Sequence, residues 1–534
     1  MARFSLPETT GPIHILARTN EYPANFEDIT HLRGSGFRIV SCRKVPNRKP
    51  RCPRVRSATG LCSITGSSRY EVDQPDLETL CRAVVTRLLF HKKLVGGQTV
   101  WVEVPHRNAA FGEVSALKDK FVYQFVRVWS HQEFCQSFVG KLRQRYERAN
   151  AELSMSGFIT AKDSWISGFV KFEKCSVKDG RDPRLISPRS PKFNLAIGIY
   201  LKPLEKALYR AIDFLFGHRV VLKGFNALEQ GKILREHWCA VDDPVCIMID
   251  ASRFDEHVHQ DALRFEHDVY RGFFPGDSEF SRILDFQLNN TFVCNADDGY
   301  LKFEVKGRRM SGDMNTSMGN VLLMSSMMYQ YLCQRLPQGS WRFADNGDDC
   351  LVILPGRLLH LVGDLGICME CWGFPCTIDG PVDSFESIEF CQTHPVFDGE
   401  NWVMVRDPRT CITKDWIVTK RITEEHVWRS YRREIALCGL AAYANMPIFR
   451  SMYRCMLRGC ERSKAVYDSN QSGLRQLARG MHADDREPSD AARVSFFCAF
   501  GIPPVHQRAI EMVYDRMTVE WVFQTHPYTR FHFA

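Results

Sequence analysis

The sequence lacks an uninterrupted apolar run long enough to cross a bilayer. Its longest apolar stretches, such as Leu351–Leu365, are broken by residues like Arg357, His360 and Asp364. A membrane-spanning helix needs about 20 predominantly apolar residues. The beginning of the chain also lacks a basic head followed by an apolar segment and a small-residue cleavage site. We therefore expect a soluble chain without a secretion signal, in a cytosolic setting.

The twenty cysteines lack the regular spacing of a disulfide framework. They are scattered through apolar runs, which in a reducing compartment is typical of buried thiols. Cys368 and Cys371 form a CxxC motif with Cys376 nearby, but no second pair follows at zinc-finger spacing. We expect core thiols at these positions, with neither a structural disulfide nor a structural zinc.

The sequence also lacks internal repeats, low-complexity tracts and a complete phosphate-binding loop. The string GFNALEQGK over residues 224–232 has glycines too far apart for such a loop, and Ile233 replaces the required hydroxyl residue. The glycine spacing and the missing hydroxyl residue exclude a P-loop NTPase or helicase.

The chain does contain enough apolar and aromatic material for a large core. Its 534 residues are 44% apolar and 12% aromatic, and a chain of this length exceeds one compact domain. The net charge of +8 suits a polyanionic partner such as nucleic acid. We expect a folded protein of several lobes.

A basic, proline-rich segment marks a boundary near the N-terminus. Cys42–Arg56 holds seven basic residues, three prolines and no acidic residue, so it should be extended and should pack poorly. Two interpretations stay open: the segment contacts RNA phosphates, or it is a solvated linker.

The periodicity predicts mixed secondary structure followed by a helical end. Residues 121–150 have helix-like spacing, and strand-like segments follow over residues 165–172. After about Arg406 the pattern becomes mainly helical, interrupted by polar segments around residues 470–490. This predicts a separate C-terminal lobe.

Two predicted strands present carboxylates at their ends. The run PVCIMID over residues 244–250 is apolar and β-prone and ends at Asp250, with Asp255 five residues later. Further on, Asn346-Gly347 lies between two β-prone runs in WRFADNGDDCLVIL, a strong hairpin signal. We expect Asp348 and Asp349 at the tip of that hairpin.

Alone, an acidic turn of this kind is more often an exposed loop than a metal site. Together, two strand ends that carry carboxylates can converge to hold two Mg²⁺ ions, which take oxygen ligands and bridge to substrate phosphates. Such a pair of ions drives in-line phosphoryl transfer without a side-chain nucleophile. We therefore interpret Asp250, Asp348 and Asp349 as catalytic metal ligands.

A loop and helix between the two acidic elements suggest contacts to a nucleotide. Ser311-Gly312 is typical of a tight loop that opens a helix, on which Thr316 and Asn320 fall four apart on one face. Asn320 both donates and accepts, so with Asp255 it suits a ribose 2′-hydroxyl. The methionines of this segment are interpreted as flexible core filling.

Basic residues upstream alternate with β-prone ones, as in a strand and loop that line a channel for triphosphates. The candidates are Lys171, Lys174, Arg184 and Arg189. His257 and His259 follow the first acidic motif, and we expect them to cap or line the next helix without a catalytic role.

In this order, the motifs resemble those of the right-hand polymerases of positive-strand RNA viruses, most closely the tombusviruses and tombus-like viruses. The resemblance spans about Phe138 to Arg406 and covers the motifs that this family calls F, A, B, C and E. The matching strings are FVKFEK, RLISPRSPKFN, YLKPLEKAL, VVLKGFNALEQG, PVCIMIDASRFDEHV, SGDMNTSMGN, NGDDC, IEFCQTHPV and WVMVRDP.

The resemblance implies an RNA-directed RNA polymerase. It makes Asp250 and Asp348 the principal ligands of Mg²⁺, or of Mn²⁺ as a substitute, with Asp349 assisting. The residues expected to contact the nucleotide's ribose, base or triphosphate are Asp255, Ser311, Gly312, Thr316, Asn320, Lys171, Lys174, Arg184 and Arg189.

The resemblance also implies an α+β right-hand fold of fingers, an RRM-like antiparallel palm and a helical thumb. The expected divisions are an N-terminal extension over 1–110 that is part of the fingers, fingers over 111–240, palm over 241–410 with a fingers insertion at about 265–305, and thumb over 411–534. Expected partners are single-stranded RNA template, nascent RNA, NTPs and a membrane-anchored viral replication protein. The expected location is the host cytoplasm, at membrane-associated replication complexes.

One departure from the family concerns a lysine that follows a Gly-Phe pair and is proposed to protonate pyrophosphate. Here the string is GFPCTID, and Thr377 occupies about that place. The general acid is therefore left unassigned.

Two other functions compete with RNA synthesis from NTPs. A non-catalytic RNA-binding replication or coat protein needs the basic charge and aromatics but not three converging acids. A reverse transcriptase or DNA polymerase shares those acids but excludes the 2′-hydroxyl with a bulky residue where this chain has Asp255. Asp255 and Asn320 favour ribonucleotides.

Overall fold

The computed structural model describes residues 15–17, 29–45, 56, 58–61, 70–176, 181–464, 472–483 and 486–521. Most of the basic segment Cys42–Arg56, namely residues 46–55, lies outside the described residues, so its two interpretations stay open. No helix in the described part of the chain is long and apolar enough to cross a membrane.

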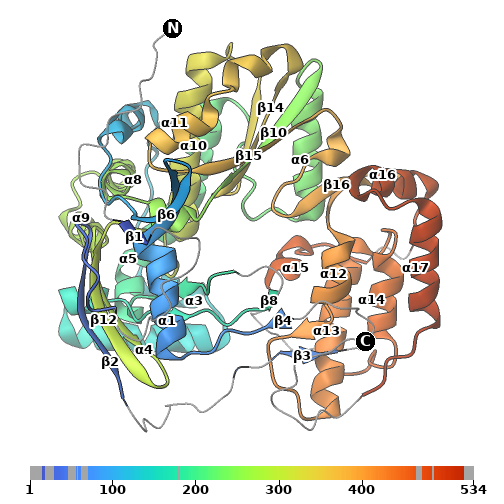
Figure 1. Ribbon diagram of the computed structural model, residues 1–534, viewed down its shortest axis with the longest axis horizontal. Helices are drawn as coiled ribbons and strands as arrows, with labels where there is room; N and C mark the ends of the chain where they lie inside the picture. Colours follow the sequence, from blue (N-terminus) through green and yellow to red (C-terminus); the bar gives the residue numbers. More distant parts are fainter. Residues whose placement is uncertain are drawn as a thin grey trace.

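A four-stranded antiparallel sheet forms the centre of the fold, in the strand order β13-β14-β10-β15. Helix α6 (Ala227–Cys239) lies beside one face, and α10 (Thr316–Arg335) and α11 (Leu365–Cys371) lie beside the other (Figure 1). The strands are β10 (Pro244–Ala251), β13 (Arg342–Asp345), β14 (Asp349–Pro355) and β15 (Cys376–Val382).

Both faces of this sheet are buried, because alternate residues of a strand point to opposite faces. On β14, Val352 and Leu354 pack into the core that contains α10. Their neighbours Leu351 and Ile353 pack into a second core with α6 and the C-terminal helices. Burial on both faces explains why β10 and β14 are nearly continuous apolar runs.

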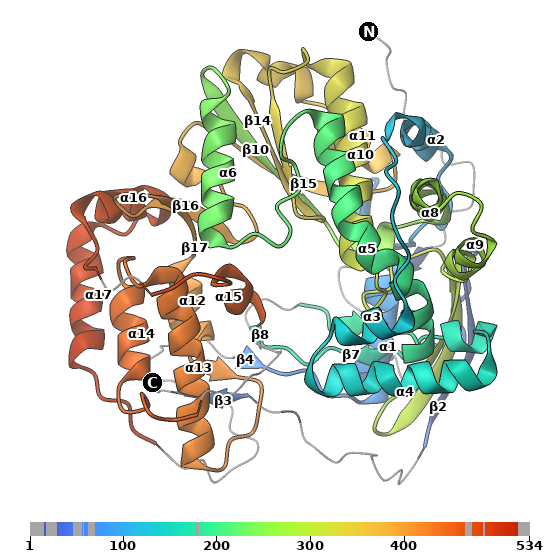
Figure 2. The ribbon, with the colours of Figure 1, turned by 180° about the vertical axis from the view of Figure 1, so that it is seen from behind.

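An N-terminal lobe of helices and two small sheets lies next to the central sheet. In Figure 2, α4 runs along the lower edge of this lobe. One sheet has the order β11-β12-β2 and the other β1-β6-β5. Its main elements are β1 (Ile15–Ala17), β2 (Phe37–Lys44), α1 (Leu77–Val84), β5 (Phe90–Val95), β6 (Gln98–Glu103), α3 (His131–Gln136), α4 (Gly140–Ser156), α5 (Pro191–Phe216), α8 (Gln260–Phe273), α9 (Ser278–Asp285), β11 (Asn289–Asn295) and β12 (Gly299–Lys306).

The C-terminal part is mainly helical, as predicted. It packs around Trp416, Tyr443 and Tyr453, which are almost fully buried. A hairpin of β16 (Thr393–Phe397) and β17 (Trp402–Arg406) precedes it. The helices are α12 (Pro408–Lys414), α13 (Glu425–Tyr443), α14 (Phe449–Leu457), α15 (Ser472–Leu477), α16 (Asp490–Phe500) and α17 (Pro504–Arg516).

One pair of short strands joins the N-terminal part of the chain to the C-terminal part, and a second pair lies between the N-terminal lobe and the C-terminal helices (Figure 1). β3 (Thr59–Gly60) pairs with β18 (Ile417–Val418), and β4 (Tyr70–Glu71) pairs with β8 (Cys175–Ser176). The remaining short elements are α2 (Gly112–Ser115), β7 (Phe169–Val170), β9 (Leu185–Ile186) and α7 (Phe254–His257).

One predicted helix is shorter than its pattern indicated. Residues 121–130 are not helical, and the helical part of that segment begins at α3. Ser130 ends the extended stretch, because its side chain accepts from the N–H of Glu133 while Glu133 bonds back to Ser130. This capping box fixes the start of the helix. The strand-like prediction over residues 165–172 is confirmed only for β7.

Candidate active site

The three predicted carboxylates meet at one end of the two inner strands of the central sheet, β10 and β14. Asp250 is the register partner of Asp349 on the neighbouring strand. Asp348 directly precedes Asp349, and its carbonyl accepts the N–H of Ala251 at 2.9 Å. Facing residues of an antiparallel pair have Cα atoms about 4.5–5.5 Å apart, so their side chains are neighbours. The strand register thus brings Asp250 and Asp349 together with Asp348 beside them, and their role as metal ligands stays a prediction.

The tip that carries Asp348 is the predicted Asn-Gly hairpin. Gly347 has a φ of +108°, which favours glycine. Its N–H donates to Oδ1 of Asp345 at 2.6 Å, and the N–H of Asn346 donates to the carbonyl of Asp349 at 3.0 Å. The turn therefore fixes where Asp348 leaves the sheet.

Negative charge is concentrated at this end of β10 and β14. Burial raises the pKa of Asp349 to about 7; the N–H of Cys391 opposes that rise, and Asp348 and Asp250 add to it. Burial also raises the pKa of Asp250, and the charge of Asp348 raises it further. Carboxylates that repel one another in this way favour a bound cation, which would relieve the repulsion.

The donor set fits a magnesium-type ion shared with a substrate better than a closed protein cage. Among the described residues, no group of three His, Cys, Asp or Glu side chains lies close enough to hold a metal alone. Mg²⁺ in phosphoryl-transfer sites is usually held by one or two carboxylates, waters and substrate phosphates. The registered pair Asp250 and Asp349, with Asp348 beside it, supplies hard oxygen ligands of this kind.

A second polar pair lies beside the carboxylates. Nδ2 of Asn320, on α10, donates to Oδ1 of Asp255 at 2.9 Å. Asn320 is almost fully buried and Asp255 is partly buried. Burial raises the pKa of Asp255, while the Asn320 hydrogen bond and the charge of Arg309 lower it. The predicted pairing of Asp255 with Asn320 is thus present in the structure.

The loop before α10 docks on the segment at residues 185–189, which includes β9. Oγ of Ser311 accepts the N–H of Ser187 at 3.1 Å. A Cβ on Gly312 would lie 2.6 Å from Cα of Pro188, so only glycine allows this approach. The hydroxyl of Thr316 donates to the carbonyl of Met310 at 2.7 Å. These three residues therefore shape the loop in this structure.

Two of the four predicted basic residues, Lys171 and Arg184, share one acidic partner. Nζ of Lys171 lies 2.9 Å from Glu173, which Arg184 approaches at 3.5 Å. Lys171 is partly exposed and Arg184 is exposed. Burial raises the pKa of Asp255, and the positive charge of Arg184 opposes that rise.

The other two do not line a channel here, which corrects the sequence interpretation. Nζ of Lys174 donates to the carbonyls of Lys414 and Ile417, at 2.8 and 2.6 Å. It thereby satisfies a carbonyl at the C-terminal end of α12, where helix carbonyls lack helical partners. Arg189 is 3% exposed and forms a 2.6 Å ion pair with Asp313.

Several residues that hold the site were missed from the sequence. Asp345 is fully buried and accepts from Ser325 at 2.5 Å, and burial raises its pKa to about 8. Arg309 and Glu266 form a buried ion pair next to Asn320. The position of Asp345 two residues before Gly347 was a usable turn signal, whereas nothing local links Arg309 to Glu266.

The weaker sequence interpretations also have clear outcomes. Nδ1 of His259 caps α8 by accepting from Ala262, and its Nε2 lies 3.0 Å from the carbonyl of Trp372, so its predicted structural role is confirmed. His257 contacts the carbonyl of Arg253 at 3.2 Å. Thr377 lies opposite Asp250 in the β10–β15 register.

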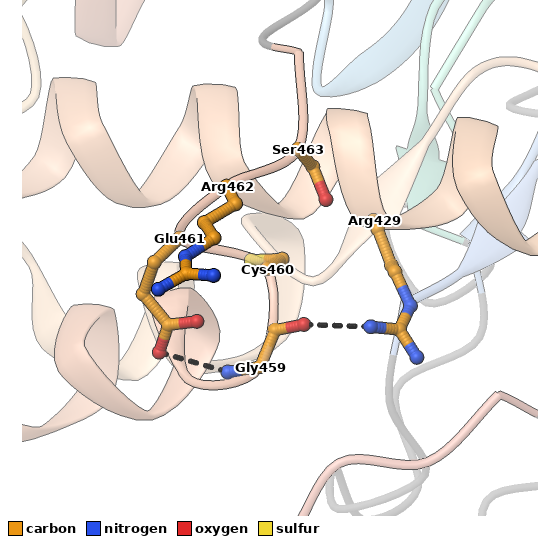
Figure 3. A pocket seen from close by; sticks show the side chains of 6 residues that line it. All are labelled: Arg429, Gly459, Cys460, Glu461, Arg462 and Ser463. Carbon is orange, nitrogen blue, oxygen red and sulfur yellow. Dashed lines mark hydrogen bonds between the residues drawn. The ribbon is translucent and has the colours of Figure 1, made fainter.

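Figure 3 shows a pocket in the C-terminal lobe. Two hydrogen bonds join residues of its lining: Arg429 donates to the carbonyl of Gly459, and the N–H of Gly459 donates to Glu461, both at 2.9 Å. It contains none of the predicted site residues. The lining residues are Arg429, Gly459, Cys460, Glu461, Arg462 and Ser463.

Comparison with known proteins identifies similar chains. A family model described as viral RNA dependent RNA polymerase matches residues 44–522. The RNA-directed RNA polymerase of Oat chlorotic stunt virus is 35% identical over 468 residues, which cover 83% of this chain and 62% of that protein. That of Melon necrotic spot virus is 38% identical over 483 residues, covering 88% and 60%. That of Tobacco necrosis virus (strain A) is 32% identical over 489 residues, covering 89% and 66%. This chain thus spans less than two thirds of each relative's length.

Proposed function

Since the chain belongs to the viral RNA dependent RNA polymerase family, we propose that it catalyses template-directed RNA synthesis from NTPs on a single-stranded RNA template. The observation that carries this proposal is the convergence of Asp250 and Asp349 in register, with Asp348 beside them. The biological role is replication, and with it transcription, of the genome of a positive-strand RNA virus similar to the tombusviruses.

In the proposed mechanism, Asp250 and Asp348 hold Mg²⁺, or Mn²⁺ as a substitute, and Asp349 assists. Two such ions, when bound, supply activation of the attacking 3′-hydroxyl and neutralisation of the triphosphate and pyrophosphate. The chain itself contributes position: the β10–β14 register sets the carboxylates side by side. The N–H of Cys391 orients Asp349 through a 2.9 Å hydrogen bond to its Oδ2.

Selection of ribonucleotides is assigned to Asp255 and Asn320. Their hydrogen bond lies at the start of α10, next to the strand that carries Asp250. A 2′-hydroxyl can donate to a carboxylate and accept from an amide at the same time. Ser311, Gly312 and Thr316 shape the adjoining loop. This supports an RNA polymerase over a reverse transcriptase or DNA polymerase.

For the triphosphate we retain Lys171, which is partly exposed, and Arg184, which is exposed. Lys174 and Arg189 instead support the loops that carry them, through the contacts to α12 and to Asp313. A guanidinium suits phosphate oxygens because it offers several donors in a fixed fork.

The proposed architecture is an α+β right hand. The central sheet with α6, α10 and α11 corresponds to the palm, the N-terminal lobe to the fingers, and α12–α17 to a helical thumb. The antiparallel order β13-β14-β10-β15 supports the palm assignment. We further propose that a membrane-anchored viral replication protein recruits the chain to replication complexes in the host cytoplasm.

The test is incorporation of labelled nucleotide on a defined single-stranded RNA template, with Mg²⁺ or Mn²⁺. Wild type and the double variant Asp348→Ala, Asp349→Ala are compared with NTPs and with dNTPs. The proposal expects complementary RNA from wild type and NTPs only. A preference for dNTPs would favour a DNA polymerase or reverse transcriptase. RNA binding without incorporation would favour a binding protein, and equal activity of both chains would reject the site.

A further inference from the structure

Arg309 links the ribose-facing pair to a buried acid. Its Nε donates to Oδ1 of Asn320 at 2.9 Å, and its Nη1 donates to Oε1 of Glu266 at 3.0 Å. Its Nη2 forms a second bond to the same carboxylate. Arg309 is 3% exposed and Glu266 is fully buried. The guanidinium therefore has a fixed orientation, with one edge on Glu266 and its Nε on Asn320.

This arrangement decides which way the Asn320 amide points. An amide can turn by 180° and exchange its oxygen and nitrogen, since the two ends differ little in shape. Arg309 can only donate, so the oxygen of Asn320 must face it. The Nδ2 group of Asn320 must then face Asp255, which it reaches at 2.9 Å. The reversed amide would place two donors together and two acceptors together.

We propose that Arg309, held by Glu266, is a positioning residue that fixes the Asn320 amide and thereby sets discrimination between NTPs and 2′-deoxy-NTPs. The inference rests on the proposed function of Asp255 and Asn320 in ribose recognition. With the amide fixed, one N–H of Asn320 is bound to Oδ1 of Asp255. The second N–H of Asn320 then remains to donate to a 2′-hydroxyl, and the other carboxylate oxygen of Asp255 remains to accept from it.

The surroundings are built to hold this ion pair. A Cβ on Gly319 would lie 2.4 Å from Nη2 of Arg309 and 2.6 Å from the Glu266 oxygens, so α10 admits the pair only because it has glycine there. Oε1 of Glu266 also accepts from Asn315 at 2.6 Å. The N–H of Arg309 donates to the carbonyl of Asp255 at 2.8 Å, which ties the same residue to both members of the ribose pair.

Arg308 supplies a matched control. It is 1% exposed and stands next to Arg309, but its guanidinium donates to backbone carbonyls of Leu88, Val104 and Pro105. Replacing either arginine with lysine keeps the charge and loses the fixed fork of donors. Both variants disturb a buried arginine, yet only Arg309→Lys removes the bond that orients Asn320.

The experiment measures kcat/KM for one NTP and its 2′-deoxy counterpart opposite the same template base. The readout is the ratio of the two values, which a general loss of stability leaves unchanged. For Arg309→Lys we expect the preference for the ribonucleotide to fall by about tenfold, as for one lost hydrogen bond. For Arg308→Lys we expect the wild-type ratio even where total activity drops.

The inference is overturned if folded Arg309→Lys keeps the wild-type ratio, or if Arg308→Lys lowers it equally. If Arg309→Lys does not fold, Glu266→Gln takes its place, because it leaves Arg309 without its opposite charge. A lower ratio of the two kcat/KM values in Glu266→Gln supports the inference, and an unchanged ratio overturns it. A wild-type chain that incorporates no nucleotide rejects the proposed function itself, and the inference with it.

Discussion

The backbone N–H of Cys391 donates a 2.9 Å hydrogen bond to Oδ2 of Asp349. The donor belongs to the segment between β15 and β16, so a residue 42 positions along the chain orients the carboxylate that follows the hairpin turn. That bond stabilises the ionised form of Asp349, whereas burial and the neighbouring acids stabilise the protonated form.

The first prediction concerns pH and metal affinity. Burial and negative neighbours raise the pKa of Asp349 to about 7, so below that pH a metal must displace a proton. As the pH is raised toward about 7, the Mg²⁺ concentration that gives half-maximal incorporation should fall by up to about tenfold for each pH unit. Above about pH 7 it should stay constant. In Asp349→Asn this pH dependence should be weaker. A half-saturation concentration that is constant between about pH 6 and about pH 8 would contradict this account.

The second prediction separates the basic residues. Lys174→Met loses two hydrogen bonds to carbonyls near the C-terminal end of α12. It should therefore lower the free energy of unfolding by about 1–3 kcal/mol, and with it the melting temperature, without changing KM for NTPs. Arg184→Ala should raise KM severalfold with little change in melting temperature. Steady-state kinetics and thermal unfolding on both variants check this. A raised KM in Lys174→Met with unchanged melting temperature would restore its predicted contact with triphosphate.

The third prediction concerns Asp345, which holds the turn before Asp348. Asp345→Ala leaves the hydroxyl of Ser325 and the N–H of Gly347 without their acceptor, which should cost about 1–3 kcal/mol and reduce incorporation. Asp345→Asn keeps the shape and an acceptor, so it should remain close to wild type near neutral pH. Denaturant unfolding and incorporation assays measure both effects. Equal loss in the two variants would mean that the charge of Asp345 itself is required.

The same residue gives a pH signature. Burial raises the pKa of Asp345 from 3.8 to about 8, so between these values the folded chain keeps a proton that the unfolded chain has released. Wild type should therefore lose stability relative to Asp345→Asn as the pH rises from about 4 to about 8. A stability difference that is constant over this range would contradict the burial argument.

The sequence was most informative where chemistry follows local pattern. An apolar run that ends in Asp250, an Asn-Gly turn before Asp348, and a four-residue spacing from Thr316 to Asn320 all predict placements that the structure confirms. Each depends on periodicity or turn chemistry within a short window. The apolar faces of β14 could not be assigned to two cores from its sequence, because both faces are apolar.

Long-range contacts were beyond the same reasoning. Lys174 bonds to residues about 240 positions away, and Arg189 pairs with Asp313, which lies 124 positions along the chain. A basic residue between β-prone ones has the same local pattern whether it faces a phosphate or a buried carboxylate. The extended stretch over residues 121–130 was also missed, since the capping box at Ser130 competes with the helical periodicity before it.

The most direct test of the catalytic site compares single isosteric changes of neighbouring acids. Asp250→Asn and Glu389→Gln each remove one negative charge, and Glu389 acts electrostatically on Asp250 without being an expected metal ligand. Single-nucleotide incorporation should fall on the order of 10³-fold in Asp250→Asn, as for about 4 kcal/mol of lost transition-state stabilisation, and by less than about tenfold in Glu389→Gln. Equal, modest losses in the two variants would mean that Asp250 contributes only to the local field, and would contradict its assignment as a metal ligand.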